Sequence, residues 1–204
     1  MSKPIDDIDD TREGHWMQLS SGGRFWPGDP RSGEVFIEDI AAGLATNARY
    51  AGQYRADIIR AGKFYSVAEH CVHLADYAYL SDGQPSDVCL AVLLHDAAEA
   101  YIRDLPRAVK HSAGDTYARM EGRVQAAIER RYNIALVAWK HQNYIKKLDR
   151  RIVPLEKAAF MNATDSSWAF DQFEPLPGIR IEMWPPAKAY DRFLKAARLF
   201  GVTS

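Results

Sequence analysis

The sequence predicts a mostly α-helical fold, in which one domain carries a small β-hairpin as an accessory. Apolar residues recur at helical spacing through most of the chain, and capping, proline and glycine signals separate these stretches. Near the start, a Gly-Gly pair between weakly alternating residues predicts the hairpin. The 204 residues, 47% apolar and 26% charged, are typical of one soluble globular domain with a sizeable core.

The first part of the chain is predicted to hold a tail, the hairpin and one helix. Residues 1–14 are acidic and polar, which favours a flexible tail over a signal or transit peptide. Residues 15–204 are then expected to form the single domain. The hairpin falls in residues 16–27, WMQLSSGGRFWP, and a helix is predicted over residues 36–50, FIEDIAAGLATNARY, whose apolar side chains share one face.

Two helices with clear start signals follow. Ser66 and Glu69 fit a capping box, in which each side chain bonds the backbone N–H of the other residue. Pro85 marks the start of the next helix, which we expect to run to about Ile102 before an Asp-Leu-Pro break.

Helical patterns also dominate the second half of the chain. Residues 115–132 predict a charged amphipathic helix, and residues 141–169 a long one with a kink or break at Pro154. Residues 179–183 are expected to form a short strand that pairs with the N-terminal hairpin. Pro186 then starts the last helix.

The stretch VLLHDAAEAY, residues 92–101, carries the first chemical signal. His95 and Asp96 interrupt an apolar helical run, and Glu99 follows at spacings that share a helix face with them. The alanines between and after these residues are small enough to let another group approach. Because polar groups in an apolar setting cost several kcal/mol unless they are compensated, a divalent metal ion is the expected compensation.

Ligands from elsewhere in the chain would have to complete such a site. His70 lies in the first turn of a helix beside an apolar face, and Asp149 interrupts the apolar stripe of the long helix. Each has an ordinary alternative, as a hydrogen-bonded core histidine and as a surface acid. His73 is a surface or supporting residue by the same reasoning. Cys71 and Cys89 form no C-x-x-C pair, which favours reduced, buried thiols and a cytoplasmic protein.

The four candidate ligands resemble the H…HD…D signature of the HD-domain superfamily of metal-dependent phosphohydrolases, in the order His70, His95, Asp96 and Asp149. Three segments are similar to the bacterial 5′-deoxynucleotidase branch, namely SVAEH, LLHDAAEAYIRDLPRAVK and IKKLDRRIVPLEKA. The resemblance covers residues 47–158, and a related branch hydrolyses deoxynucleoside triphosphates in phages. It implies a single HD-type helical domain.

The resemblance also implies roles for individual residues. The four residues of the signature would bind one divalent ion, for which Mn, Co, Fe, Ni, Zn and Mg remain open. Glu99 and Asp104 would be the acids of the chemical step.

In the resembled branch, an arginine followed by an aromatic residue contacts the phosphate and sugar of the substrate. Arg49 and Tyr50 match it, but the linker to the first histidine is longer here, which leaves Arg55 as the alternative. Lys110 is either a second phosphate contact or a helix-surface lysine.

The resemblance implies a (deoxy)nucleoside 5′-monophosphate phosphohydrolase and, in this branch, a homodimer. A triphosphate triphosphohydrolase and a non-catalytic module that binds metal or nucleotide are the alternatives. The partner expected is a small phosphorylated substrate. A net charge of −1 gives no footprint for a nucleic-acid backbone, and no apolar stretch has membrane-spanning length.

Overall fold

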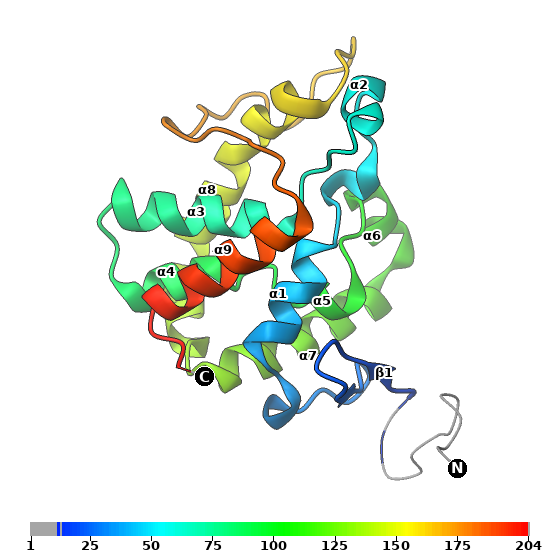
Figure 1. Ribbon diagram of the computed structural model, residues 1–204, viewed down its shortest axis with the longest axis vertical. Helices are drawn as coiled ribbons and strands as arrows, with labels where there is room; N and C mark the ends of the chain where they lie inside the picture. Colours follow the sequence, from blue (N-terminus) through cyan, green and yellow to red (C-terminus); the bar gives the residue numbers. More distant parts are fainter. Residues whose placement is uncertain (1–11, 13, 204) are drawn as a thin grey trace.

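The computed structural model describes residues 12 and 14–203 and confirms the mostly α-helical fold (Figure 1). The strands are β1 (Met17–Gln18) and β2 (Arg24–Phe25), and short 3-10 turns occupy η1 (Ser32–Glu34) and η2 (Arg49–Gly52). The helices are α1 (Ile37–Ala45), α2 (Ala56–Arg60), α3 (Val67–Leu80), α4 (Ser86–Leu93), α5 (Glu99–Ile102), α6 (Arg107–Ala113), α7 (Asp115–Arg131), α8 (Ala135–Phe160) and α9 (Pro186–Leu199).

Most of the predicted tail, residues 1–14, lies outside the described residues. Arg12 is described, and its guanidinium lies 3.9 Å from the centre of the Trp26 ring and pairs with the carboxylates of Asp29 and Glu34. This arginine therefore packs against the domain.

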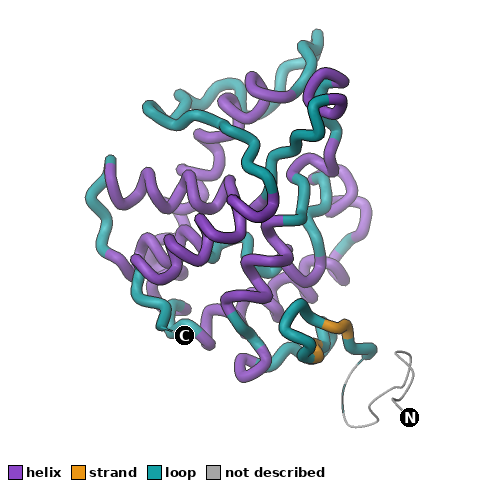
Figure 2. The backbone as a smooth tube through the Cα atoms, viewed as in Figure 1, coloured by secondary structure: helices purple, strands orange, loops and turns teal. Residues whose placement is uncertain are grey.

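The predicted hairpin is confirmed, and Figure 2 shows it at the edge of the helical body. Its two strands pair antiparallel, with Met17 opposite Phe25. The Phe25 side chain is fully buried and stacks on Tyr101 with 4.0 Å between ring centres. The hairpin is thereby joined to α5 through the core.

The strand predicted over residues 179–183 is wrong, because this segment has no regular secondary structure. Its end is held by the buried carboxylate of Glu69, which accepts hydrogen bonds from the backbone N–H groups of Glu182, Met183 and Trp184 at 2.9, 2.9 and 2.6 Å. Half of the predicted capping box is present, since the Ser66 hydroxyl accepts from the Glu69 N–H at 3.1 Å. The Glu69 side chain instead joins α3 to the chain that leads into α9.

The core is built around α3, which packs against α1, α4, α8 and α9. In Figure 1, α9 lies in front, next to α1 and α3. The last helix therefore packs on two helices from the first half of the chain. Ser66 starts α3, and the buried residues of its first turn include Glu69 and His70. The first turn of α3 thus directs two polar side chains into the interior.

The single helix predicted from Pro85 to Ile102 is wrong. The structure ends α4 at Leu93, follows it with turns over residues 94–98, and starts α5 at Glu99. His95, Asp96 and Glu99 therefore do not share one helix face, and the two ligand candidates lie on a loop.

A close helix contact limits where α5 can lie. A Cβ atom added to Gly43 of α1 would lie 2.6 Å from the backbone oxygen of Ala100. Ala100, one of the small residues after the His-Asp pair, therefore lets α1 pack closely against α5.

Two other predicted helices have different bounds. The helix predicted over residues 36–50 ends as α1 at Ala45, and the chain then turns through η2. Helix α8 begins and ends earlier than the predicted residues 141–169, and it continues through Pro154 without a break. Within the described residues, no helix has both the length and the apolar character that crossing a lipid bilayer requires.

Candidate metal centre

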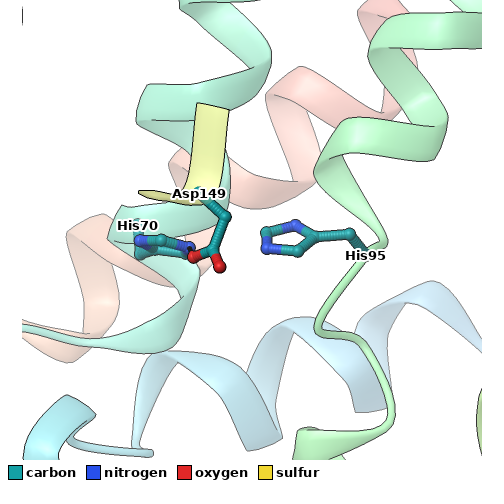
Figure 3. A group of neighbouring side chains, drawn as sticks. All are labelled: His70, His95 and Asp149. Atoms are coloured by element: carbon teal, nitrogen blue, oxygen red, sulfur yellow. Dashed lines mark ion pairs between the residues drawn. The ribbon is translucent and has the colours of Figure 1, made fainter. Parts of the chain in front are cut away.

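The four predicted ligands meet at one place, although they come from three parts of the chain. His70 Nε2 lies 3.4 Å from Asp149 Oδ1 and 3.8 Å from Asp96 Oδ2. His95 Nε2 lies 3.3 Å from the same Asp96 oxygen. Figure 3 shows the Asp149 carboxylate between the imidazole rings of His70 and His95. These four residues are candidate ligands for one metal ion, and we call them the metal cluster.

Hydrogen bonds orient both imidazoles of the metal cluster in the same way. His70 Nδ1 lies 2.7 Å from Glu156 Oε1, and His95 Nδ1 lies 2.7 Å from the backbone oxygen of Val92. Because both partners are acceptors, each Nδ1 donates, and each neutral ring then keeps a lone pair on Nε2. These two Nε2 atoms are buried and have no hydrogen-bond partner.

The ligand atoms of three cluster residues are spaced nearly as closely as those of a metal site. A divalent ion about 2.1 Å from its ligands would separate neighbouring ligand atoms by about 3.0 Å and opposite ones by about 4.2 Å. The ligand atoms of His70, His95 and Asp149 all lie within 4.8 Å of one another. When both imidazoles are neutral, their two Nε2 lone pairs and the two carboxylates form a donor set that suits divalent transition metals. These buried His and Asp groups could therefore hold a metal ion.

Cys71 also lies near the cluster, and its Sγ falls within 4.8 Å of ligand atoms of His95 and Asp96. Burial raises the pKa of the Cys71 thiol well above its usual value, which opposes the thiolate form that binds metals. Cys71 and Cys89 are both buried free cysteines. Their packing agrees with the expectation of core thiols.

Sequence reasoning missed Glu156, a fully buried carboxylate of α8. It accepts from His70 Nδ1, and its other oxygen accepts from the Tyr50 hydroxyl at 2.5 Å. Histidines that bind metals commonly donate their other N–H to such a carboxylate, which orients the ring. The signal in the sequence was the spacing, because Glu156 follows Asp149 by seven residues, or about two helical turns.

The charges of the cluster are strongly coupled. Burial and the Arg49 guanidinium oppose a charge on His70, but Glu156 and Asp149 outweigh them and raise the pKa of its imidazole to about 9. Although burial acts in the opposite direction, Arg49 and His70 lower the pKa of Glu156 to about 2. His70 likewise holds the pKa of Asp149 well below its usual value against the effect of burial. A divalent ion at His70 would take the place of this proton.

Arg49 lies against the metal cluster, with its side chain only 11% exposed. Its guanidinium nitrogens lie 3.3 Å from Asp96 Oδ2, 3.9 Å from Asp149 Oδ1 and 3.4 Å from Glu156 Oε1. The next residue, Tyr50, has a φ of 55°, a left-handed conformation that is uncommon for a residue with a side chain. The strained turn thus places Arg49 and Tyr50 together at the cluster.

Arg55, the alternative to Arg49, lies away from the cluster. Its side chain pairs with Asp57 at 3.2 Å and reaches the backbone oxygen of Met161 at 3.5 Å. Arg55 is absent from the lining of the pocket beside the metal cluster.

That pocket, of about 570 Å³, is lined by the remaining predicted site residues. Among its lining residues are Tyr50, Glu99, Asp104 and Lys110. Glu99 Oε1 accepts from the Lys110 ammonium at 3.1 Å, whereas its Oε2 is buried without a partner. Lys110 also donates to Glu121 at 2.8 Å, so its ammonium is shared between two acids.

Burial, together with the neighbouring carboxylates of Asp96 and Asp104, raises the pKa of Glu99 well above its usual value. Lys110 acts in the opposite direction. A carboxyl group whose pKa is raised keeps its proton to higher pH than an ordinary glutamate, which is the direction that suits a general acid.

A second cavity of about 350 Å³ reaches the cluster from the side of α7 and α8. His95, Asp96 and Asp149 line it together with Gln125, whose amide donates to the backbone oxygen of Leu94 at 2.9 Å. The Gln125 oxygen accepts from the Ala98 N–H at 3.3 Å. Gln125 therefore clamps both ends of the turn that carries His95 and Asp96.

Two bacterial proteins are similar to this chain along most of its length, whereas no family model matches it. The uncharacterized protein YfdR of Escherichia coli K12 is 28% identical over 184 residues, which cover 88% of this chain and 92% of YfdR. The uncharacterized protein RCAP_rcc00048 of Rhodobacter capsulatus is 32% identical over 184 residues, which cover 87% of this chain and 91% of that protein. This chain belongs to the same protein family as RCAP_rcc00048.

Proposed function

We propose that the protein is a metal-dependent phosphohydrolase of the HD-domain type that acts on (deoxy)nucleoside 5′-monophosphates. One observation carries the proposal. The Nε2 atoms of His70 and His95 are buried without partners and meet two carboxylates, in the order along the chain that the HD signature has. The metal proposed is one divalent ion, and Mn, Fe, Co, Ni and Zn suit this donor set.

The side chains around the cluster match the needs of phosphate ester hydrolysis. A bound divalent ion would supply Lewis acidity, which activates water and polarises a phosphoryl oxygen. Arg49 offers a planar guanidinium beside the cluster, where it can bind phosphate oxygens. Glu99 would donate a proton to the leaving oxygen of the ester, and its raised pKa supports that role. Asp104 shares the pocket and raises the pKa of Glu99 further.

The charges of the pocket favour a monophosphate over a triphosphate. Four carboxylates and three basic side chains line it, namely Asp96, Glu99, Asp104, Asp149, Arg49, Arg107 and Lys110. Lys110 is already paired with Glu99 and Glu121. If Glu99 carries the proton that it donates, the other three carboxylates and the three basic side chains cancel, and one divalent ion leaves the lining with a formal charge of about +2. This charge suits one phosphate group better than three.

The test combines metal analysis with product analysis. Protein loaded with Mn²⁺ or Co²⁺ is expected to release orthophosphate from nucleoside 5′-monophosphates. Release of tripolyphosphate from nucleoside triphosphates would instead support the triphosphohydrolase. A metal-loaded protein that turns over neither class of nucleotide would support a binding module and contradict the proposal.

Replacing Arg49 with alanine is expected to weaken substrate binding and turnover while the metal stays bound. Because the guanidinium lies within 4 Å of two cluster carboxylates, its loss also removes a cation that competes with the ion. Metal affinity should therefore be equal or higher in Arg49→Ala. The measurements are KM, kcat and a metal titration, and Arg55→Ala is the matched control. The reverse pattern, with only Arg55→Ala impaired, would move the phosphate contact to Arg55.

Replacing Lys110 with methionine is expected to shift the pH dependence of kcat. Lys110 lowers the pKa of Glu99, so its loss raises that pKa further. If Glu99 must be protonated to act, the alkaline limb of the profile moves to higher pH. Lys110→Arg keeps the charge and should leave the limb in place. An unshifted limb in Lys110→Met would mean that Glu99 does not control the profile.

A further inference from the structure

We propose that the apolar and aromatic side chains of the pocket form a subsite for an aromatic base, and that Trp168 provides the main stacking surface. The inference rests on the proposed function, because it assumes that the phosphorylated ligand is a nucleotide. It assigns a role to residues 161–173, which follow α8 and which the resemblance to HD-type enzymes does not cover.

Two chemically different kinds of side chain line the pocket. The carboxylates of the metal cluster, Glu99 and Asp104 are the first kind. Apolar and aromatic side chains supply much of the rest, among them Leu105, Pro106, Trp168 and Phe170. A nucleotide has the same division, with a charged phosphate at one end and a flat base at the other.

Trp168 is anchored through its backbone. Its N–H donates to Asp171 Oδ2 at 2.8 Å, and the Lys157 ammonium of α8 donates to the two oxygens of Asp171 at 2.9 and 2.7 Å. These hydrogen bonds do not use the indole, so a substitution of the side chain leaves them in place. The Lys157 ammonium also lies 5.1 Å from the centre of the indole ring. The ring itself lines the pocket and is partly exposed, which leaves surface for a ligand.

Tyr50 links this aromatic surface to the metal cluster. Its ring lies 5.9 Å from that of Trp168, at an angle of 41°. Its hydroxyl donates to Glu156, the carboxylate that orients His70. A base held at Trp168 would therefore lie near Tyr50, which is hydrogen-bonded to the metal cluster through Glu156.

Phe170 is less suited to be the stacking surface, because the cation against its ring lies closer than the one against Trp168. The Arg107 guanidinium lies 4.0 Å from its centre, and Phe173 stacks on it with 6.1 Å between the centres. Phe170 and Arg107 therefore form a packed wall of the pocket.

The proposed subsite would not select among bases by stacking alone. Stacking on a flat ring tolerates any base, since every base has a π-face.

The experiment compares two ligands that differ only in the base. A nucleoside 5′-monophosphate and ribose 5-phosphate are titrated by calorimetry into metal-loaded protein that also carries Glu99→Gln, so that hydrolysis during the titration is slow. We expect Trp168→Ala to bind the nucleotide roughly 5- to 100-fold more weakly, the range that the loss of one stacked base implies. Ribose 5-phosphate affinity should not change. Trp168→Phe should restore most of the nucleotide affinity.

Trp139→Ala is the matched control, because Trp139 also lies on the outside of the molecule, at 68% exposure, but does not line the pocket. Equal weakening of both ligands by Trp168→Ala, or no weakening of either, would overturn the subsite, as would a wild-type protein that binds no nucleotide. Trp168-dependent nucleotide binding without phosphate release would leave the subsite standing and overturn the hydrolase.

Discussion

Asp96→Ala is expected to lose both the bound metal and phosphate release. One oxygen of Asp96 lies within 4 Å of both histidine Nε2 atoms, so this carboxylate is the shared neighbour of the proposed ligands. Its removal also deprives Arg49 of a partner at 3.3 Å. Metal affinity should fall by more than the roughly 10- to 100-fold seen when only a hydrogen-bond partner of a ligand is lost. A metal titration and the phosphate assay measure the two effects.

Glu99→Gln is the informative companion to this variant. Glutamine has nearly the same shape and can still accept from Lys110, but it cannot donate a titrating proton. We expect full metal content with turnover lowered about 10²- to 10⁴-fold, the usual worth of a general acid or base. Wild-type turnover in metal-replete Glu99→Gln would remove Glu99 from the mechanism. Full metal content in Asp96→Ala would remove Asp96 from the ligand set.

Sequence reasoning brought the four cluster residues together because each is a polar group within an apolar pattern. The surroundings of His70 and Asp149 along the chain are helical, and the structure places both on helices, α3 and α8. In such positions, apolar periodicity indicates which side of the helix faces inward. A polar side chain on that side is then a candidate for a buried site.

The same reasoning failed for the segment that carries His95 and Asp96. Its composition favours a helix, with three alanines and two leucines within residues 93–100. The structure breaks the helix after Leu93, and Gln125 of α7 bonds the backbone at Leu94 and Ala98. Contacts from a distant helix thus compete with the local preference, and helical periodicity within one segment cannot predict them.

The partners of Glu69 are a second case in which a local sequence pattern does not predict a long-range contact. The capping pattern predicted a local partner for its carboxylate, but the structure uses it for backbone groups of residues 182–184, more than a hundred residues away. A buried carboxylate that accepts three N–H groups is well compensated, so both arrangements satisfy the same physical requirement. Sequence spacing recognises only the local one.

The apolar stripe of α8 does not predict Glu156, because apolar periodicity marks only the aliphatic residues of the buried face. Ile152, Val153 and Phe160 are buried around it, and the helix returns Glu156 to the face of Asp149. A glutamate on that face is expensive unless it is paired. The structure pairs it with His70, Arg49 and Tyr50, which makes it the carboxylate that joins the metal cluster to the proposed phosphate contact.

Glu156→Gln is expected to weaken metal binding about 10- to 100-fold, because His70 would lose the charged acceptor that orients its ring and makes Nε2 a better donor. The amide oxygen can still accept from Nδ1, so the ring should stay near its place. Without metal, the variant should also be less stable, since Arg49 and His70 lose a buried counter-charge. Glu156→Ala should cost more, about 3–5 kcal/mol, as is usual when one partner of a buried ion pair is removed.

The two measurements separate the roles of Glu156. A titration with Mn²⁺ or Co²⁺ reports on His70 as a ligand, and thermal unfolding in chelator reports on the charge balance of the buried network. Glu174→Gln, on an exposed glutamate, is the control for charge loss and should change neither. A lower unfolding temperature with unchanged metal affinity would mean that Glu156 only neutralises Arg49. A loss of metal affinity beyond the loss of stability would mean that this carboxylate, seven residues after Asp149, is part of the metal site.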